Sequence, residues 1–490
     1  MSVLRIHPCN SKVFEFRGQP LVLLCATEHY GAVINRPFDF TKYLADAHAH
    51  KQTLTRLFTL FRELQSERNP YSTCKPETPD YIAPFKRVGP ERALDGGLKY
   101  DLAQWNPEFF DRLHRFLSQA SEYGIVVEVV LLSNTYADNI WRLNPLHPRN
   151  NLQGLEPVDF PDYTSLRHES LWRWQAAHLQ RIVTECNRYD NIFFEVCNEP
   201  GGCFPGKPQA PTTTEVDKWQ QEIIALIRRT EENMPNQHLI AGQEAFTWGP
   251  EFNQTSDKTF RELPMDIVNM HPLPNTAYGG IRYDMGNFMA KELKLRALRD
   301  FALATRQEPK PLNYDEDNAA SQYKDSEGWT IHRKRAWTAL LCGAHYDMID
   351  FSILPYLESG TPASQAHIRS WMGYLSTFIH SVDLVRARPL VGWVRGLPEQ
   401  VAESVLAVPG EDYCIYLADA RELDAGVGTA LRVGVSLDLP AGSFELAGFS
   451  PVTGLCSPAL PVDGGNNVKI RVPAFTHDTL VRIRKTGGTS

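Results

Sequence analysis

The feature that most constrains the fold of this 490-residue sequence is a regular alternation of short apolar runs with amphipathic segments. Each apolar run has the length of one buried strand, and the segments between them carry apolar residues at helical spacing. Eight such runs occur, at 20–26, 53–58, 125–132, 191–200, 238–242, 266–270, 311–318 and 346–351. Strands that alternate with helices in this way predict an α/β fold, a parallel (β/α)8 TIM barrel.

The expected helices have recognisable starts and faces. Asn106-Pro107 is an N-cap followed by a proline in the first turn, and apolar residues then recur on one face until Gly124. The other expected helices span 40–51, 168–189, 215–233, 288–305 and 329–342. Two long connections, 60–104 and 137–166, show little periodicity, and connections of that length are usually functional. We expect both to form walls of a cleft.

The pattern of apolar and polar residues changes at about residue 385. Short alternating runs at 413–417, 431–439, 443–449, 467–472 and 479–483 are separated by Gly, Pro and Asp turns. This pattern predicts a small all-β domain, an antiparallel β-sandwich. The expected division is therefore a catalytic barrel at 1–384 and a sandwich domain at 385–490.

Charge and cysteine usage exclude several classes of protein. The formal charge is −8 without a basic block, so a nucleic-acid partner is not expected. The N-terminus lacks an apolar signal region and no stretch has the length of a membrane span, which predicts a cytoplasmic protein without a membrane partner. Nine scattered cysteines without Cys-x-x-Cys, and histidines without paired spacing, predict neither a disulfide framework nor a metal or other cofactor. Composition does not address the oligomeric state.

Two acidic residues lie at strand ends where barrel enzymes carry their chemistry. The fourth run ends in Asn198-Glu199-Pro200, and the seventh run ends at Glu316. Strands four and seven present their C-terminal ends at the same barrel mouth. Two facing carboxyls are what glycoside hydrolysis requires, one to protonate the leaving oxygen and one to attack the anomeric carbon or activate water. The tripeptide alone would occur by chance in many proteins, so the pair carries this interpretation.

Three charged neighbours extend the predicted site. Arg56 lies inside the second apolar run, where an unpaired charge is too costly, so it needs an anionic partner; a purely structural ion pair is the alternative. Asp315 and Asp317 flank Glu316. Because alternate residues of a strand point to opposite faces, we expect Glu316 not to share the barrel interior with these neighbours. A solvated loop or a cation site are the alternatives for this acidic run.

The order of these strand ends resembles a known group of enzymes. Arg56 in strand two, Asn198-Glu199-Pro200 in strand four, His271 after strand six and Glu316 in strand seven are similar to glycoside hydrolase clan A, the retaining (β/α)8 glycosidases that include family 5 cellulases. With the segment 450–454 in the sandwich, the chain also resembles cellulase-like proteins that carry a small C-terminal β-domain. The resemblance implies Glu199 as acid/base and Glu316 as nucleophile. It further implies that Asn198 binds the sugar 2-hydroxyl, that Arg56 orients Glu316, and that His271 lines the site.

The sequence departs from the family pattern in two places. The seventh strand reads Tyr-Asp-Glu-Asp, and strand eight ends at 350–352 without the tryptophan that many family members have there. The aromatic platform under the reactive sugar is therefore open, with Trp248, Trp141 and Tyr278 as candidates. Other strand-end residues expected to bind substrate are His29, Asn134 and Tyr314, together with Trp248.

The expected function is a retaining β-glycosidase that acts by double displacement on oligosaccharides or glycosides. The long loops favour exo action on short substrates. A carbohydrate-binding protein without turnover is the main alternative, favoured by the altered strands seven and eight. A metal-dependent hydrolase that uses Asp315 to Asp317 is a third possibility, which the lack of clustered histidines disfavours.

Overall fold

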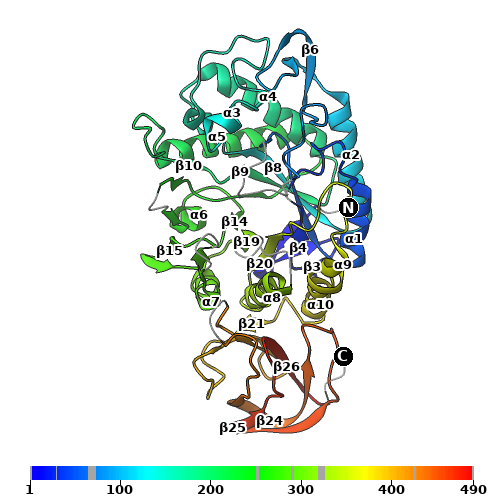
Figure 1. Ribbon diagram of the computed structural model, residues 1–490. Helices are drawn as coiled ribbons and strands as arrows, with labels where there is room; N and C mark the ends of the chain where they lie inside the picture. The colour runs from blue at the N-terminus through cyan, green and yellow to red at the C-terminus, as the bar shows by residue number, and fades with distance from the viewer. Residues whose placement is uncertain are drawn as a thin grey trace.

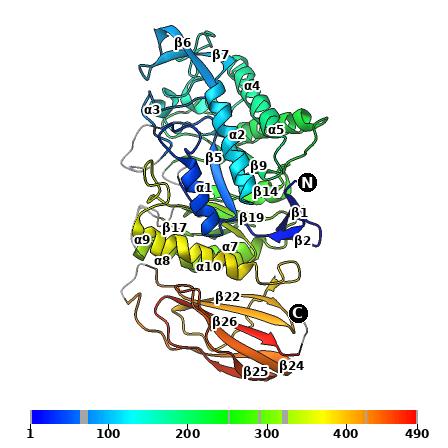
Figure 2. The ribbon, with the colours of Figure 1, turned by 90° about the vertical axis from the view of Figure 1, so that its right-hand side faces the viewer.

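The computed structural model describes residues 3–28, 30–63, 73–249, 253–287, 292–317, 326–422 and 426–487. A large barrel, coloured blue through yellow, lies above a smaller β-domain in orange and red (Figure 1). The view turned by 90° shows the helices α8 and α10 between the barrel and that domain (Figure 2).

Eight strands form one parallel sheet that curves into the predicted barrel. They are β4 (Leu24–Thr27), β5 (Leu54–Phe58), β8 (Val126–Ser133), β9 (Ile192–Asn198), β11 (Ile240–Gly242), β14 (Ile267–Asn269), β19 (Leu312–Asp317) and β20 (His345–Ile349). Their hydrogen-bonded order is β4-β20-β19-β14-β11-β9-β8-β5. Successive strands are thus neighbours around the barrel, as the (β/α)8 prediction requires.

The seam between β4 and β5 is closed by fewer hydrogen bonds than the other strand pairs. Thr53 N donates to Leu24 O at 3.0 Å, and Phe58 N donates to Tyr30 O at 3.0 Å. The side chain of Gln52 accepts a hydrogen bond from Ala26 N at 3.1 Å. These contacts hold the first and second strands side by side and complete the ring.

One helix follows each barrel strand. They are α1 (Phe40–Ala49), α2 (Pro107–Glu122), α4 (Glu169–Cys186), α5 (Thr213–Glu231), α6 (Asp257–Arg261), α7 (Leu295–Thr305), α8 (Ser326–Leu341) and α10 (Ser370–Ile379). The predicted cap of α2 is confirmed, because Asn106 accepts from Glu108 N and Phe109, Phe110, Leu113, Phe116, Leu117 and Ala120 are buried. The helices α6 and α10 were not anticipated from the sequence.

The N-terminal segment covers the bottom of the barrel. β1 (Arg5–His7), β2 (Asn10–Phe16) and β3 (Gln19–Leu21) form an antiparallel sheet ahead of β4. Its apolar residues Leu4, Phe14 and Phe16 pack with the first residues of several barrel strands, Leu54, Val126, Phe193 and Ile267 among them. This small core fills the N-terminal end of the barrel.

The connections at the C-terminal ends of the strands contain more structure than their sequences indicated. The first long connection includes an antiparallel hairpin, β6 (Phe85–Arg92) with β7 (Leu98–Trp105). The second includes α3 (Asp138–Trp141) and the 3-10 turn η1 (Phe160–Thr164). Short elements complete this side: β10 (Gly201–Gly202), β12 (Phe246–Thr247), β13 (Gln254–Thr255), β15 (Thr276–Tyr278), β16 (Ile281–Tyr283), β17 (Gly286–Asn287), β18 (Glu292–Leu293), α9 (Pro362–Ser364) and the π-helical η2 (Gln365–Arg369).

The predicted all-β C-terminal domain is confirmed. Its strands are β21 (Arg388–Pro389), β22 (Val401–Val408), β23 (Asp412–Asp419), β24 (Gly434–Phe449), β25 (Leu460–Arg471) and β26 (Asp478–Lys485), in the antiparallel order β21-β22-β23-β26-β24-β25. Two predicted runs, 431–439 and 443–449, belong to the single long strand β24, and β22 was not anticipated. The expected division at 384 and 385 falls between α10 and β21 and stays a prediction.

The strands β22, β23 and most of β26 are buried on both faces of the sheet, which explains their apolar sequences. Along β23, Tyr413, Ile415 and Leu417 face the domain's own core, whereas Cys414 and Tyr416 face the helices of the barrel. Tyr416 stacks on Trp337 of α8, with ring centroids 5.5 Å apart. Arg333 of α8 forms a buried ion pair with Asp478 of β26 at 2.6 Å. The domain therefore supports α8, the helix that follows strand seven.

Candidate active site

The predicted catalytic carboxyls lie at the barrel mouth, and both occupy unusual backbone conformations. Glu199 follows β9 directly with φ +50°, and Glu316 in β19 has φ +55°. Tyr30 and Tyr136, near the ends of β4 and β8, also have positive φ values, +58° and +54°. Left-handed conformations are costly for residues other than glycine and cluster at functional sites. Four of the strand ends at this mouth are therefore held in strained geometry.

A β-bulge in β19 changes which residues enter the barrel. Tyr314 pairs with Tyr346 and Asp317 pairs with Met348, so three steps along β19 match two along β20. The additional residue lets Asp315 and Glu316 both contact Arg56 inside the barrel, at 3.0 and 2.9 Å. The expectation that Glu316 would not share the interior with its acidic neighbours is therefore wrong for Asp315. It holds for Asp317, which pairs outside the barrel with Arg335 and Tyr346.

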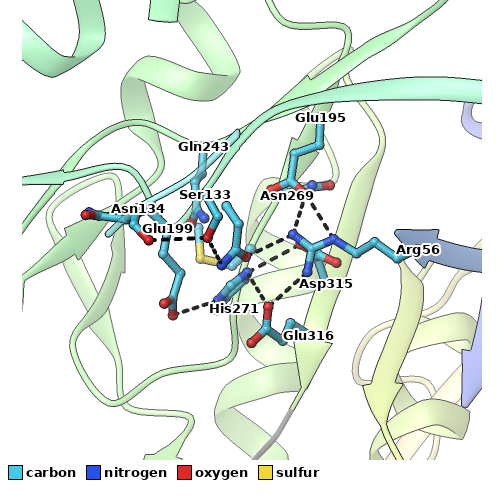
Figure 3. Close-up of polar contacts among 12 residues, drawn as sticks. Arg56, Ser133, Asn134, Glu195, Glu199, Gln243, Asn269, His271, Asp315 and Glu316 are labelled. Carbon is cyan, nitrogen blue, oxygen red and sulfur yellow. Dashed lines mark hydrogen bonds and ion pairs between the residues drawn. The ribbon is translucent and has the colours of Figure 1, made fainter. Parts of the chain in front are cut away.

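Arg56 forms ion pairs with the acidic residues of β9 and β19 (Figure 3). Its Nη1 donates to Glu316 Oε2 at 2.9 Å, and its Nη2 donates to Asn198 Oδ1 at 2.9 Å. Its Nε donates to Glu195 Oε2 at 2.9 Å. The guanidinium is fully buried and also lies over the ring of Tyr30, with its central carbon 4.6 Å from the ring centroid. Arg56 therefore has the buried anionic partners that the sequence predicted, and it also holds one oxygen of Glu316.

His271 connects the two predicted catalytic carboxyls. It follows β14, and its Nδ1 lies 3.2 Å from Glu199 Oε1. Its Nε2 lies 3.3 Å from Asp315 Oδ2 and 3.9 Å from Glu316 Oε2. The imidazole therefore has carboxyl groups at both ring nitrogens, as Figure 3 shows. Glu199 and Glu316 face the same small volume at the mouth.

Burial and charge act in opposite directions on these groups. Burial raises the pKa of Glu316 above the usual range, although the charges of His271 and Arg56 oppose that shift. Burial would lower the pKa of His271, but Glu316, Asp315 and Glu199 outweigh it and raise the pKa of this imidazole well above its ordinary value. The surrounding carboxyls therefore favour the protonated form of His271, and Glu316 keeps its proton to higher pH than an exposed glutamate.

The two amide side chains near Glu199, those of Asn198 and Asn134, have different structural roles. Asn198 Nδ2 donates to Tyr136 Oη at 2.7 Å while its Oδ1 accepts from Arg56, so the amide orientation is fixed. Asn134 Nδ2 donates to the backbone oxygen of Glu199 at 3.0 Å, and Asn134 Oδ1 accepts from Tyr136 N at 3.2 Å. Asn134 was predicted to bind substrate, whereas both polar atoms of its side chain hold the strained backbone at Glu199 and Tyr136.

Aromatic rings form a wall beside Glu199. Trp248 is half-buried, lies edge-on to Tyr136 at 5.5 Å, and stacks with Phe204 at 5.9 Å. A Cβ atom on Gly201 would lie 2.0 Å from Trp248 Nε1, so only glycine fits at this position. The Gly-Gly that follows Asn198-Glu199-Pro200 thus lets the indole approach the strand end. Trp248 remains our candidate for the platform under the sugar.

Three other predicted aromatic residues have structural roles. Tyr314 is fully buried on the outer side of β19, where its hydroxyl donates to Leu298 O in α7 at 2.5 Å; its assignment to substrate binding is wrong. Trp141 is buried in its loop, with Nε1 donating to Val158 O at 2.9 Å, and Tyr278 is bound to Glu308. Neither is a sugar platform. His29 lies outside the described residues.

An inner set of carboxyls lies directly below the catalytic pair. Glu128 of β8, Glu195 of β9 and Asp315 of β19 are fully buried, with oxygen atoms within 4.8 Å of one another. Arg56 already holds Glu195, and Asn269 Nδ2 donates to Glu128 Oε1 at 2.7 Å. Since Asp317 points away from this set, the acidic run 315–317 does not form the chelate that a metal-dependent hydrolase would need.

The sequence reasoning missed three residues of this site, Glu195, Glu128 and Tyr136. Glu195 and Glu128 interrupt apolar strands in the same way as Arg56, so the rule that a buried charge needs a partner could have paired them. Tyr136 lies at the end of strand three, but only the structure shows its hydroxyl on Asn198. The inward position of Asp315 depends on the bulge, for which the sequence has no recognisable signal.

Comparisons with known proteins agree with this geometry. Residues 88–326, just under half of the chain, match the model of the cellulase family, glycosyl hydrolase family 5. This segment contains Glu199, His271 and Glu316. The described residues contain no helix long and apolar enough to cross a membrane. No curated protein matches the sequence.

Solved structures show the same fold at low sequence identity. A structure described as a glycoside hydrolase superposes with a TM-score of 0.59 at 11% identity and covers 100% of this chain and 98% of its own. A family 5 glycoside hydrolase from Bacteroides vulgatus ATCC 8482 gives a TM-score of 0.60 at 10% identity, with 99% and 94% covered. The endo-1,4-beta-mannanase from Rhizomucor miehei gives 0.50 at 13% identity, with 77% and 100% covered. The predicted resemblance to family 5 glycoside hydrolases is thus confirmed over residues 88–326, and the chain shares with the solved glycoside hydrolases a (β/α)8 barrel followed by a small C-terminal all-β domain.

Proposed function

We propose that this protein hydrolyses β-glycosidic bonds with retention of configuration, with Glu316 as nucleophile and Glu199 as acid/base. The observation that carries the proposal is the contact of both carboxyls with one imidazole, that of His271, while Arg56 holds Glu316 from the other side. Such a pair at the ends of strands four and seven matches the requirements of double displacement.

The first chemical step forms a covalent intermediate. Arg56 holds Glu316 Oε2, so Oε1 is the oxygen that attacks the anomeric carbon. As this bond forms, the bond from the anomeric carbon to the leaving oxygen breaks, and its electron pair goes to that oxygen. Glu199 transfers its proton to the leaving oxygen and becomes a carboxylate. The leaving alcohol departs, and the sugar stays bound to Glu316 as an ester.

The second step reverses these roles. A water molecule attacks the anomeric carbon and gives a proton to Glu199, while the ester bond breaks and returns its electron pair to Glu316. The net reaction consumes one water and restores both carboxyls to their starting states. Two inversions at the same carbon give overall retention.

The substrate is proposed from the surroundings of the pair. Asn198, fixed by Arg56 and Tyr136, is placed to hydrogen-bond the sugar 2-hydroxyl, and Trp248 is placed to stack on a sugar ring. The hairpin β6–β7 and the loop with α3 follow the C-terminal ends of β5 and β8, and Glu199 and Glu316 lie at the C-terminal ends of β9 and β19. Long connections beside the mouth favour a pocket that accepts the end of a short oligosaccharide, hence exo action.

Hydrolysis of a panel of aryl β-glycosides tests the proposal. The panel should contain pyranosides and furanosides, and it should include β-mannosides because one similar structure is an endo-1,4-beta-mannanase. We expect wild-type turnover of at least one member and a loss of at least 10³-fold in Glu316→Ala, with partial recovery when azide replaces the missing nucleophile. Glu222→Gln, on the exposed face of α5, is the matched control and should retain full activity.

Two results would contradict the proposal. One is turnover that survives Glu316→Ala without azide. The other is tight binding of oligosaccharides without hydrolysis, unchanged in Glu199→Gln, which would instead indicate the carbohydrate-binding protein considered above.

A further inference from the structure

His271 has carboxyl groups at both ring nitrogens, and only one of them belongs to the catalytic pair. Its Nδ1 faces Glu199 Oε1 at 3.2 Å, and its Nε2 faces Asp315 Oδ2 at 3.3 Å. The family pattern implies a histidine beside the acid/base, but it does not imply a carboxylate behind that histidine. Asp315 reaches this position through the bulge in β19.

The hydrogen-bonding capacity of imidazole limits the possible charge states. A neutral ring has one N–H donor and one acceptor nitrogen, whereas the imidazolium has two donors. Carboxyl oxygens face both ring nitrogens, and only the imidazolium donates a hydrogen bond to both of them. A neutral ring has a single N–H and donates to one of these oxygens alone.

Asp315 is fixed in this arrangement. Its side chain is fully buried, and Arg56 Nη2 lies 3.0 Å from the same Oδ2 atom that faces His271. It cannot turn to solvent, and its partner Arg56 is in turn held by Glu195 and Glu316. The carboxylate is therefore a permanent acceptor for His271 Nε2.

We propose that Asp315 is a positioning residue that keeps His271 doubly protonated, so that the imidazolium donates to Asp315 through Nε2 and to Glu199 through Nδ1. The consequence for catalysis rests on the proposed function. A positive charge beside Glu199 stabilises its deprotonated form, which makes Glu199 a stronger acid in the first step. The Nδ1 proton stays on His271 throughout, so the proton given to the leaving oxygen is that of Glu199 alone.

Several ionisable groups on other strands lie around His271, Asp315 and the predicted catalytic pair. They are Arg56 from β5, Glu128 from β8, Glu195 from β9, Glu316 from β19 and Asp347 from β20, with Tyr30 and Tyr136 at the ends of β4 and β8. Burial raises the pKa of Glu128 and of Asp347 well above the usual range, which favours the neutral form of both acids. Of the buried carboxyls below the catalytic pair, Asp315 alone makes a direct contact with the His271 ring among the described residues.

The test measures the charge of His271 directly. In protein labelled with ¹⁵N-histidine, the two ring nitrogens have similar shifts in the imidazolium and widely separated shifts in the neutral ring. The His271 signal is assigned by its loss in His271→Gln. We expect an imidazolium at pH 7 in wild type and a neutral ring at pH 7 in Asp315→Asn.

The control is the same substitution on the next strand. Asp347 in β20 is equally buried but accepts a hydrogen bond from Cys25 and not from His271, so Asp347→Asn should leave His271 charged. A neutral His271 in wild type at pH 7, or an imidazolium retained in Asp315→Asn, would overturn the proposal. If Asp315→Asn does not fold, the smaller Asp315→Ser serves as the second variant and the same outcomes apply.

The pH profile of kcat/KM gives a second readout that a purely structural role would not change. Loss of the imidazolium charge raises the pKa of Glu199, so the alkaline limb should move to higher pH in Asp315→Asn and stay in place in Asp347→Asn. The acidic limb should move less, because Glu316 loses a repelling carboxylate and an attracting imidazolium together. If no substrate is turned over, the proposed function fails. The NMR measurement of the ¹⁵N-histidine shifts still determines the charge of His271 in that case.

Discussion

Replacement of Arg56 by lysine tests how much of the activity depends on the guanidinium fork. Arg56 holds Glu316 through Nη1, while Nε and Nη2 hold Glu195. Lysine keeps the charge, but its single ammonium cannot reach both carboxylates, which lie on different sides of the fork. We expect it to stay with Glu195 and Asp315 in the interior and to release Glu316.

The magnitude follows from the bond that is lost. A hydrogen bond to a charged group contributes about 1.5–3 kcal/mol, and about 1.4 kcal/mol corresponds to a factor of ten. Arg56→Lys should therefore lower kcat/KM about 10- to 150-fold. Loss of both partners in Arg56→Met would instead leave buried carboxylates uncompensated and cost about 3–5 kcal/mol of the free energy of unfolding.

The assay is hydrolysis of the best aryl β-glycoside, combined with a thermal melt of each variant. Arg369→Lys is the matched control, because Arg369 is equally buried but its guanidinium binds Asp46 and the backbone oxygen of Ala26 instead of Glu316. Activity of Arg56→Lys within two-fold of wild type, or a loss that Arg369→Lys reproduces, would refute the orienting role of Arg56.

Three further predictions concern other parts of the structure. The acidic limb of the kcat/KM profile should lie above the usual glutamate value of about 4.3, because Glu316 must be ionised to attack and burial raises its pKa; a limb at or below that value would show that Glu316 is not the group observed. Gly201→Ala should lower activity by displacing Trp248, while Gly206→Ala, at a position without close neighbours, should affect stability alone; equal activities would remove Trp248 from the site. Arg333→Met should lower the free energy of unfolding by about 3–5 kcal/mol, since it leaves Asp478 buried without its partner, and a melt unchanged from wild type would argue against the supporting role of the β-domain.

The barrel was predictable because its signals are local. Each strand is a short apolar run, and helices such as α2 have an N-cap and one apolar face, so hydrophobic period and capping were sufficient. That Glu199 and Glu316 lie close together was predictable because strand ends of a (β/α)8 barrel meet at one mouth. Glu199 and Glu316 then follow from their positions in the chain.

The remainder depends on packing between distant segments. Tyr314 was predicted to bind substrate because it lies near the end of strand seven, and strict alternation kept Asp315 out of the barrel interior. In the structure Tyr314 packs against α7, and the bulge turns Asp315 inward. The hairpin β6–β7 was missed because its residues alternate weakly and contain Pro90. Hairpins of this kind are stabilised by the surface they cover, which a single sequence does not reveal.

The central claim is that Glu316 forms a covalent bond with the sugar, and trapping that intermediate tests it most directly. The wild-type enzyme is incubated with the 2-deoxy-2-fluoro glycosyl fluoride of the glycone that the aryl glycoside panel identifies, and intact mass and peptide mass are measured. We predict a mass increase of one fluoroglycosyl unit, located on the peptide that contains Glu316 and absent from Glu316→Ala. A label on another carboxyl, or no label together with an inverted product, would contradict double displacement through Glu316.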